Sequence, residues 1–184
     1  MDRLNEIRRR KIGQLLALLP AGCDIPAPRL PLTDLAYAAC LARIAAEAPP
    51  GFAPMAGSSR RLSDLGLLGH LIMSCSRLGD PYEIWTRHAE MAGEPVRLVS
   101  RVADGEWILE FVPAPFLPAA VAAFCSEEMC AMFFAFAREI TGHDFGDFAI
   151  ELAHSAQAGA NYAAHYPCGL SFGHGRTRIR GPAS

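Results

Sequence analysis

The chain has 184 residues, of which 51% are hydrophobic and 20% charged, and its formal net charge is −2. That length fits one domain of about 150 residues with an N-terminal appendage. A charge so close to zero argues against DNA binding by this chain alone, because DNA-binding domains carry a clear basic face. No apolar run approaches the roughly 20 residues that cross a membrane, and no segment reads as a secretory signal. We therefore expect a soluble globular protein.

The six cysteines are widely spaced and form no CxxC pair. They are Cys23, Cys40, Cys75, Cys125, Cys130 and Cys168. Scattered cysteines in apolar surroundings are typical of reduced core thiols in the cytosol rather than of a disulfide framework. The sequence therefore predicts a cytoplasmic protein.

The first third of the chain is predicted to be helical. Residues 1–19 form a helix that is basic at its centre and apolar at its end. Three prolines make 21–31 a loop. A helix is expected over 33–48, where Leu35 and four alanines give a small-residue face. Residues 49–59 match no regular element and are expected to form a second loop.

Two helices are expected in the region that follows. Leu65, Leu68 and Ile72 recur at helical spacing, so one face of the first helix is apolar. Gly69 on this helix would let a second element approach closely. The second helix, over 81–91, follows an N-cap aspartate and has proline at its first position.

The second half of the chain predicts a hairpin and a long helix. Residues 96–100 and 107–112 alternate apolar and polar side chains, and the Asp104-Gly105 pair between them is a strong hairpin signal. The longest helix is expected over 119–141 and ends at Gly142.

Short elements close the chain. We expect a strand over 149–153, a short helix over 159–165, and a strand that contains Leu170 and Phe172. A last extended segment over 176–180 would place its arginines on one face. This order of elements predicts an α+β fold in which helices pack on a small, mainly antiparallel sheet within a single domain.

Several segments, taken in chain order, resemble a known family. Leu65-Gly66-Leu67-Leu68-Gly69 and Leu78-Gly79-Asp80-Pro81 come first, and Tyr166-Pro167-Cys168-Gly169-Leu170 comes near the end. The order and spacing of these segments across 62–175 resemble the N-terminal, arabinose-binding-like effector domain of AraC-type bacterial transcription regulators.

The resemblance implies a domain organisation. Residues 1–58 would form an N-terminal helical appendage, and residues 59–184 would form the effector-binding and dimerisation domain. In this family the N-terminal domain senses a small molecule, and a C-terminal domain of about 100 residues reads DNA through two helix-turn-helix units. The chain stops at Ser184 without such units, so we expect DNA contact only through a C-terminal domain that this chain lacks.

Three basic clusters are candidates for the effector site. They are Arg8, Arg9, Arg10 and Lys11; Arg97 and Arg101; and Arg176, Arg178 and Arg180. Because guanidinium groups bind phosphate and carboxylate bidentately, we expect a small anionic effector. The RxxxR spacing from Arg97 to Arg101 and from Arg176 to Arg180 resembles the arginine motif of PilZ-type receptors, which makes cyclic di-GMP the sharpest candidate. The alternative for each cluster is a solvated surface without a ligand.

No residue pattern points to catalysis, a metal or a cofactor. The six histidines show no HxxxH or HxH spacing. No P-loop, nucleophile elbow or dinucleotide fingerprint occurs. We therefore expect a protein that is not an enzyme and holds no metal or other cofactor.

The sequence favours the ligand-sensing domain of a transcription activator, homodimeric and without a membrane partner. Two alternatives stay open. One is a ligand-free oligomerisation module with the 119–141 helix as its seam, which burial of that helix within one chain would argue against. The other is a sensor of an apolar metabolite or fatty acid in an aromatic-lined pocket. The aromatic candidates are Tyr82, Trp85, Trp107, Phe116, Phe124 and Phe133.

Overall fold

The computed structural model describes residues 3–23, 25, 26, 28, 31–75, 80–88 and 93–183. The helices are α1 (Arg3–Leu18), α2 (Asp34–Glu47), α3 (Phe52–Ser58), α4 (Leu67–Met73), α5 (Asp80–His88) and α6 (Ala119–Thr141), with short 3₁₀ helices η1 (Leu62–Leu65) and η3 (Tyr162–Ala164). The strands are β1 (Val96–Ala103), β2 (Glu106–Pro113), β3 (Ala149–Glu151), β4 (Gly169–Ser171) and β5 (Thr177–Pro182).

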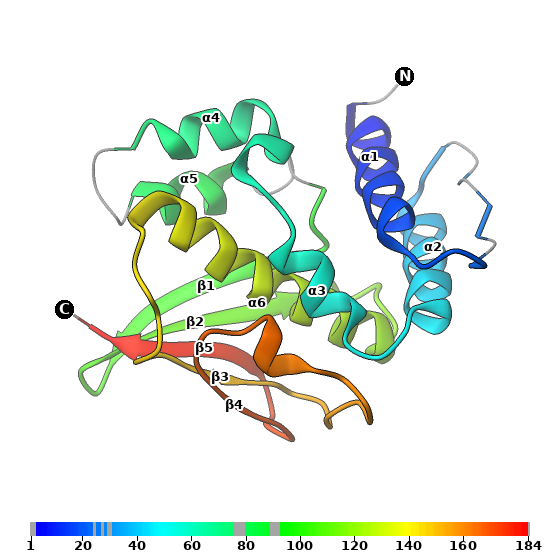
Figure 1. The fold of residues 1–184 in the computed structure, drawn as a ribbon. Coiled ribbons are helices and arrows are strands. Elements are labelled where there is room, and N and C mark those ends of the chain that lie inside the picture. The colour runs from blue at the N-terminus through cyan, green and yellow to red at the C-terminus, as the bar shows by residue number, and fades with distance from the viewer. Residues whose placement is uncertain are drawn as a thin grey trace.

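The described strands form one sheet in the order β1-β2-β5-β3-β4. Neighbouring strands are antiparallel except β3 and β4, which are parallel. Asp104 and Gly105 both have positive φ, +54° and +79°, as the tight turn between β1 and β2 requires. The helices lie on one side of the sheet (Figure 1). The predicted α+β fold, with helices on a small, mainly antiparallel sheet, is therefore confirmed.

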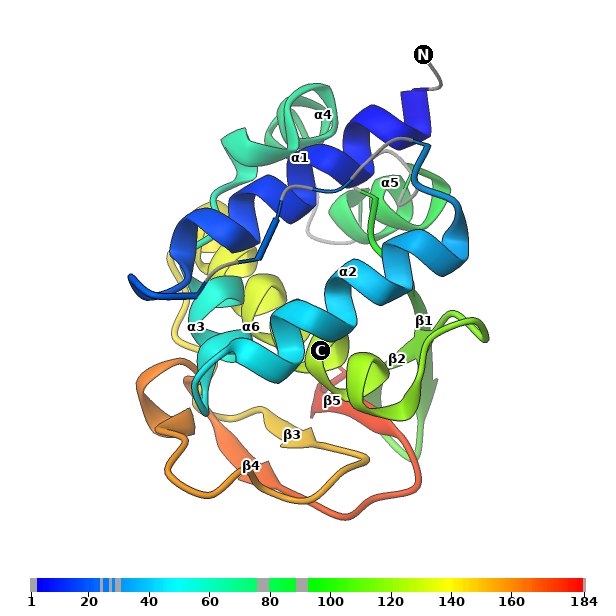
Figure 2. The ribbon, with the colours of Figure 1, turned by 90° about the vertical axis from the view of Figure 1, so that its right-hand side faces the viewer.

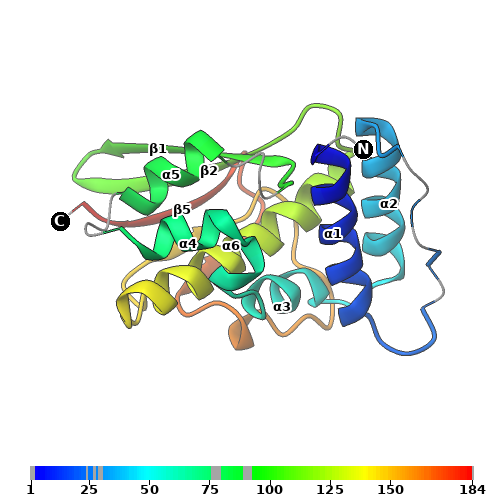
Figure 3. The ribbon, with the colours of Figure 1, turned by 90° about the horizontal axis from the view of Figure 1, so that it is seen from above.

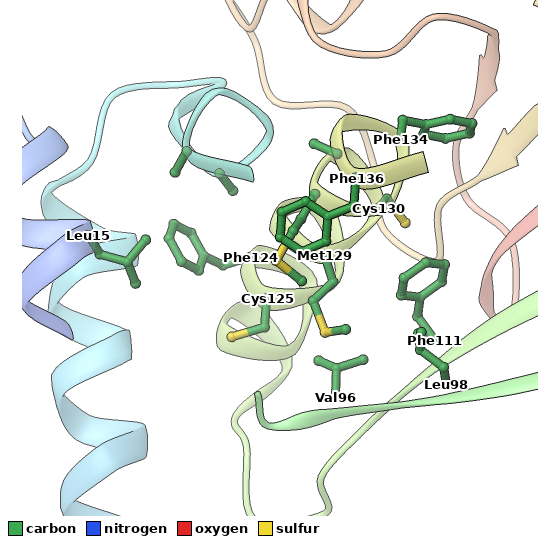
Figure 4. Close-up of a cluster of buried hydrophobic side chains, with 14 of the residues drawn as sticks. Leu15, Val96, Leu98, Phe111, Phe124, Cys125, Met129, Cys130, Phe134 and Phe136 are labelled. Atoms are coloured by element: carbon green, nitrogen blue, oxygen red, sulfur yellow. The ribbon is translucent and has the colours of Figure 1, made fainter. Parts of the chain in front are cut away.

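Helix α6 is the centre of the hydrophobic core. Figure 4 shows Leu15 of α1 on one side of this helix and Val96 and Phe111 of the first two strands on the other. By length and composition α6 could cross a membrane, but 67% of its most apolar window is buried inside the fold, as in the core helix of a soluble protein. Its burial within one chain argues against α6 as a dimer seam.

The N-terminal helices share this core. α1 and α2 run beside each other (Figure 2). Ile12 of α1 and Tyr37, Leu41 and Ile44 of α2 belong to the same buried cluster as the α6 side chains. Seen from above, α1 and α2 stand at one end of α6 (Figure 3). The first two helices therefore complete the core rather than stand apart from it.

The prediction of a loop over 49–59 is wrong, because α3 occupies most of this segment. Gly51, with φ of +79°, turns the chain into this helix. Gly57 lets α3 lie against α6: a Cβ at Gly57 would come within 2.0 Å of the carbonyl oxygen of Glu128. Packing against α6 therefore stabilises α3. The local sequence, with two prolines and a glycine before the helix, does not reveal this long-range contact.

The remaining elements follow the prediction with shifted ends. β3 ends at Glu151, two residues earlier than expected, and the short helix near 162 is a 3₁₀ helix of three residues. α5 ends at His88, and residues 89–92 of the predicted helix lie outside the described ranges. The last extended segment, β5, inserts between β2 and β3.

Candidate functional site

The register of the sheet places arginines from β1 and β5 on one face. Ile108 of β2 lies between Arg101 and Arg180, and Glu110 lies beside Arg178. Directly opposed residues of neighbouring strands point to the same face. The alternate residues of β2, such as Leu109, belong to the core beneath α6. The arginines therefore occupy the face turned away from the helices (Figure 1).

We call this surface the arginine face. Its members are Arg97, Arg101, Glu106, Ile108, Glu110, Glu151, Arg176, Arg178 and Arg180. Five arginines against three glutamates give it a net charge of +2. Arg97 is exposed, and no carboxylate among the described residues pairs with it. The arginine face therefore has positive charge left over for an anion.

Glu110 joins the two RxxxR segments. Its carboxylate accepts hydrogen bonds from Arg101 of β1, at 3.3 Å, and from Arg176, at 2.8 Å. The side chain of Glu110 is 10% exposed, whereas those of Arg101 and Arg176 are 44% and 69% exposed. Each guanidinium group is thus held at one edge and open to solvent elsewhere.

Glu151 and Glu106 hold the remaining arginines. Arg180 donates to Glu151 at 2.9 Å and to Glu106 at 3.0 Å, and Arg178 also pairs with Glu151. Burial raises the pKa of Glu151, but the hydrogen bonds from Arg178 and Arg180 lower it by more than burial raises it. The pKa of Glu151 therefore lies below the usual value. These carboxylates fix the arginine side chains before any ligand arrives.

A serine, a histidine and a carboxylate lie in a row beside the arginine face. Ser171 Oγ is 2.8 Å from His174 Nε2, and His174 Nδ1 is 3.8 Å from Glu151. The second distance is too long for a hydrogen bond. Because Glu151 already accepts from Arg178 and Arg180, it does not orient the imidazole. The row therefore lacks the hydrogen-bonded carboxylate that orients the base of a serine nucleophile.

The N-terminal cluster does not join the arginine face. Arg8 donates to the Leu32 carbonyl at 2.8 Å and lies 5.0 Å above the ring of Tyr37. Arg9 and Arg10 are exposed and line a separate groove of about 520 Å³ between α1 and α4. The role of Arg8, Arg9 and Arg10 in effector binding stays a prediction.

Lys11 is buried in what we call the charged cluster: Lys11, Arg60, Glu94 and Glu128. Lys11 Nζ contacts Glu94 and lies 2.9 Å from Glu128, and Arg60 lies 3.7 Å from Glu94. Burial lowers the pKa of Lys11, but Glu128 and Glu94 raise it more, so the lysine stays protonated. Lys11 therefore binds α1 to α6 and to the segment before β1. Its role in effector binding is untested.

A second groove, of about 430 Å³, opens where β2 ends and β5 begins. We call it the strand-end groove. It is lined by Glu110, Phe111, Val112, Pro113, Ala119, Ala122, Ala123, Ser126, Ala153, His154, Gly175, Arg176 and Thr177. Glu110 and Arg176 also belong to the arginine face, so the two surfaces adjoin. Reading the sequence alone missed this groove, since its walls come from four separate segments.

The predicted aromatic pocket residues are mostly packed inside the core. Trp107 stacks on Phe133 and Phe124 on Phe52. None of the six aromatic candidates lines either groove. Within the described ranges, no group of three or more His, Cys, Asp or Glu side chains could hold a metal ion.

Comparison with known proteins places the chain in a family. Residues 16–184 match the family described as the arabinose-binding domain of AraC transcription regulators, N-terminal. The chain belongs to this family. The AraC-type domain is also similar to the crystal structure of the transcriptional regulator CdpR from Pseudomonas aeruginosa, with a TM-score of 0.68 and 16% sequence identity.

That similarity covers 94% of this AraC-type domain and 55% of CdpR, so the chain spans about half the length of the regulator. No curated protein matches the chain. The family predicted from the sequence is confirmed. The family match begins at residue 16 and so includes α2 and α3, while the division at residue 58 stays a prediction.

Proposed function

We propose that this AraC-type domain is a cytoplasmic, homodimeric sensor that binds a small anionic effector on the arginine face. One observation carries the proposal. Two RxxxR segments, far apart in the sequence, lie on one uncovered face that holds more arginines than carboxylates. Arg97 of this face is exposed and has no carboxylate partner among the described residues, so its guanidinium group is available to an anion.

Cyclic di-GMP is the sharpest candidate for the effector. Its phosphates suit guanidinium groups, which bind two oxygens at once, and its bases suit the flat faces of arginine side chains. Arg101 and Arg176 are held by Glu110, so little side-chain freedom would be lost on binding. An organic acid is the broader alternative, because it meets the same guanidinium groups without the stacking.

Binding on the arginine face would act on the whole sheet. β5 contributes three of its arginines, counting Arg176 just before the strand, and β5 pairs with both β2 and β3. The opposite face of these strands packs on α6. An effector that favours one arrangement of the sheet would bias how two protomers orient the DNA-binding domains of a longer regulator.

The test is calorimetric titration of the chain with cyclic di-GMP, GMP and citrate. We compare the wild type with Arg97→Ala/Arg101→Ala on the arginine face and with Arg9→Ala/Arg10→Ala on α1. Both double variants remove two exposed arginines, so they are matched in charge. We expect micromolar binding of cyclic di-GMP that is lost only in the β1 variant.

Other outcomes assign the site or remove it. Loss only in the α1 variant would move the effector to the N-terminal cluster and overturn the arginine face. Heat with citrate alone would replace the dinucleotide by an organic acid. No heat with any anion would contradict anion sensing altogether. Sedimentation equilibrium of the same samples tests the homodimer, for which we expect twice the mass of 19.8 kDa.

A further inference from the structure

We infer that the groove between α1 and α4 docks an acidic amphipathic helix of a partner protein. We call this surface the α1–α4 groove. The inference goes beyond effector binding on the arginine face, because it concerns another surface and a protein partner. It rests on an exposed apolar face of α4, on arginines of α1 without carboxylate partners, and on the concave shape between the two helices. The lining residues are Arg3, Glu6, Ile7, Arg9, Arg10, Leu65 and Leu67.

The α4 side of the groove is apolar and uncovered. Leu67 lines the groove and is 63% exposed, and Leu71, one turn further along α4, is 38% exposed. Residues four apart on a helix lie on the same face, so Leu71 extends the apolar surface that Leu67 begins. Ile7 of α1 adds an apolar side chain on the opposite wall. Large apolar side chains gathered at a surface are typical of a site where another protein binds.

The α1 side of the groove is basic. Arg3, Ile7 and Arg10 follow one another at intervals of four and three residues, so they lie on one face of α1. Arg3, Arg9 and Arg10 are exposed, and none of them pairs with a carboxylate among the described residues. Three arginines against Glu6 give the lining a net charge of +2. This wall therefore attracts carboxylates, while the opposite wall attracts apolar side chains.

The concave shape favours a helix over a membrane surface. The groove has a volume of about 520 Å³. A Cβ at Gly66, just before α4, would lie 3.8 Å from a guanidinium nitrogen of Arg10, so the two walls stand close together. Leu65, 3% exposed, lies at the bottom of the groove, where a flat bilayer surface does not reach. An amphipathic helix, by contrast, lays its apolar side chains into such a groove.

The charge of the groove favours an acidic partner over a second copy of this chain. In a twofold dimer each surface patch meets its own copy, so the arginines of the α1–α4 groove would face arginines. Like charges opposed across an interface are unfavourable. Glutamate or aspartate side chains beside the leucines of a partner helix would instead pair with Arg3, Arg9 and Arg10. The occupant that matches both walls is therefore an acidic amphipathic helix.

The experiment measures binding of a synthetic amphipathic helix by fluorescence anisotropy. The probe has about 15 residues, with leucine at i, i+4 and i+7 and glutamate at the flanking positions. A matched peptide carries lysine in place of every glutamate. We expect the glutamate peptide to bind the chain about tenfold more tightly than the lysine peptide. Equal affinities, or no binding of the glutamate peptide, would overturn the proposal.

Charge-reversal variants locate the binding surface. Arg9→Glu/Arg10→Glu should reverse the preference, so that the lysine peptide binds more tightly than the glutamate peptide. Arg43→Glu/Arg138→Glu makes the same change of charge at exposed positions of α2 and α6 and should keep the preference of the wild type. A reversal in both variants would show that net charge, rather than the α1–α4 groove, selects the peptide, and would refute the assignment.

An apolar variant tests the other wall. Leu67→Ser should weaken binding of the glutamate peptide about tenfold, since it removes the most exposed leucine of the groove. Leu35→Ser makes the same change on α2, where the side chain is 79% exposed, and should leave binding unchanged. Both positions are exposed, so we expect both variants to keep the circular dichroism spectrum of the wild type. Unchanged binding by Leu67→Ser would contradict docking in this groove.

Two other occupants are outcomes that would overturn the proposal. A dimer that dissociates in Leu67→Ser, measured by sedimentation equilibrium, would assign the groove to a second copy of the chain. Binding to phosphatidylglycerol vesicles that Leu67→Ser abolishes, without binding of the glutamate peptide, would assign the groove to a membrane.

This proposal and the effector proposal fail separately. Binding of the glutamate peptide at the α1–α4 groove, with no heat from any anion, would remove the effector of the arginine face and keep the docking surface. Binding of cyclic di-GMP through Arg97 and Arg101, with no binding of the peptide, would remove the docking surface alone.

Discussion

Lys11 has a different role in the structure from the one that its sequence neighbours suggest. In the sequence it closes a run of basic residues, but in the fold its side chain is 1% exposed and lies between two glutamates that are fully buried. Four charges buried together are costly to desolvate, and the pairs offset that cost only while every partner is present. The charged cluster is therefore sensitive to loss of any one member.

Replacing Lys11 by Met should destabilise the domain by about 3–5 kcal/mol, because it leaves Glu94 and Glu128 buried with Arg60 as their remaining cation. Urea unfolding at pH 7 measures this change. Arg9→Met removes the same charge from an exposed position of the same helix and should change the free energy of unfolding by less than about 0.5 kcal/mol. Similar effects of the two changes would contradict the role given to Lys11.

Glu151 predicts a pH dependence on the arginine face. Its pKa in the folded state lies below the unfolded value, because hydrogen bonds from Arg178 and Arg180 outweigh its burial. Such a group stabilises the fold above the unfolded pKa of about 4.3, and that stability is lost as the pH falls through the folded pKa. Glu151→Gln lacks this contribution.

We therefore expect the free energy of unfolding of Glu151→Gln to fall less than that of the wild type between pH 7 and pH 3. Urea unfolding at several pH values checks it. Asp144→Asn, at an exposed position outside the arginine face, is the control and should follow the wild type. Parallel pH curves for wild type and Glu151→Gln would show that the two arginines do not hold this carboxylate.

Some side-chain roles could not be read from local sequence. The small-residue face expected on α2 includes Leu35, yet that side chain is 79% exposed. The helix does bury Ala38 of that face, but together with Tyr37, Leu41 and Ile44. Glu110 and Arg176 form an ion pair although they are 66 residues apart in the sequence, so no local pattern predicts their contact. Packing of α2 against α1 and α6 decides the first outcome, and the pairing of β2 with β5 decides the second.

At the scale of elements, Gly69 allows α4 to pack closely against η1. A Cβ at Gly69 would lie 1.8 Å from the carbonyl oxygen of Leu62, so the close approach expected from the sequence is present. Gly69→Ala should therefore destabilise the domain by about 1–3 kcal/mol, as overpacking does. Gly13 of α1 has no atom within 4 Å of its added Cβ, so Gly13→Ala should stabilise by about 0.5–1 kcal/mol.

Thermal unfolding of both glycine variants checks the pair. We expect the midpoint to fall for Gly69→Ala and to rise for Gly13→Ala. A fall of similar size in the unfolding midpoint of both variants would contradict this explanation. It would mean that the contact with Leu62 does not cause the destabilisation of Gly69→Ala.

Elements with strong local signals were predictable. The 119–141 helix has its predicted bounds and ends at Gly142, whose φ is +66°. The hairpin turn at Asp104-Gly105 also lies where expected. α3 escaped prediction because its reason to exist is contact with another helix, through Gly57. The local sequence was thus enough to predict the hairpin turn and the long helix. The short helix α3 could not be predicted in this way, because it depends on contact with another element.

At the scale of the whole molecule, α1 is predicted to be indispensable. Removing residues 1–31 would take Ile12, Leu15 and Lys11 out of the core and leave the carboxylates of the charged cluster without their lysine. We expect the shortened chain to lose its cooperative unfolding transition in calorimetry. Removing residues 183–184 should leave the transition unchanged. A cooperative transition in the shortened chain would show that the first helix is a separable appendage.

The order of the strands leaves β1 and β4 at the two margins of the described sheet. Unpaired margins invite strands of other molecules, and short length or charged side chains discourage that association. β4 has three residues, while the eight-residue β1 exposes Arg97 and Arg101. We therefore expect the same two arginines that would hold an effector also to discourage edge-to-edge aggregation. Neutralising them should lower the solubility limit of the protein, whatever ligand it senses.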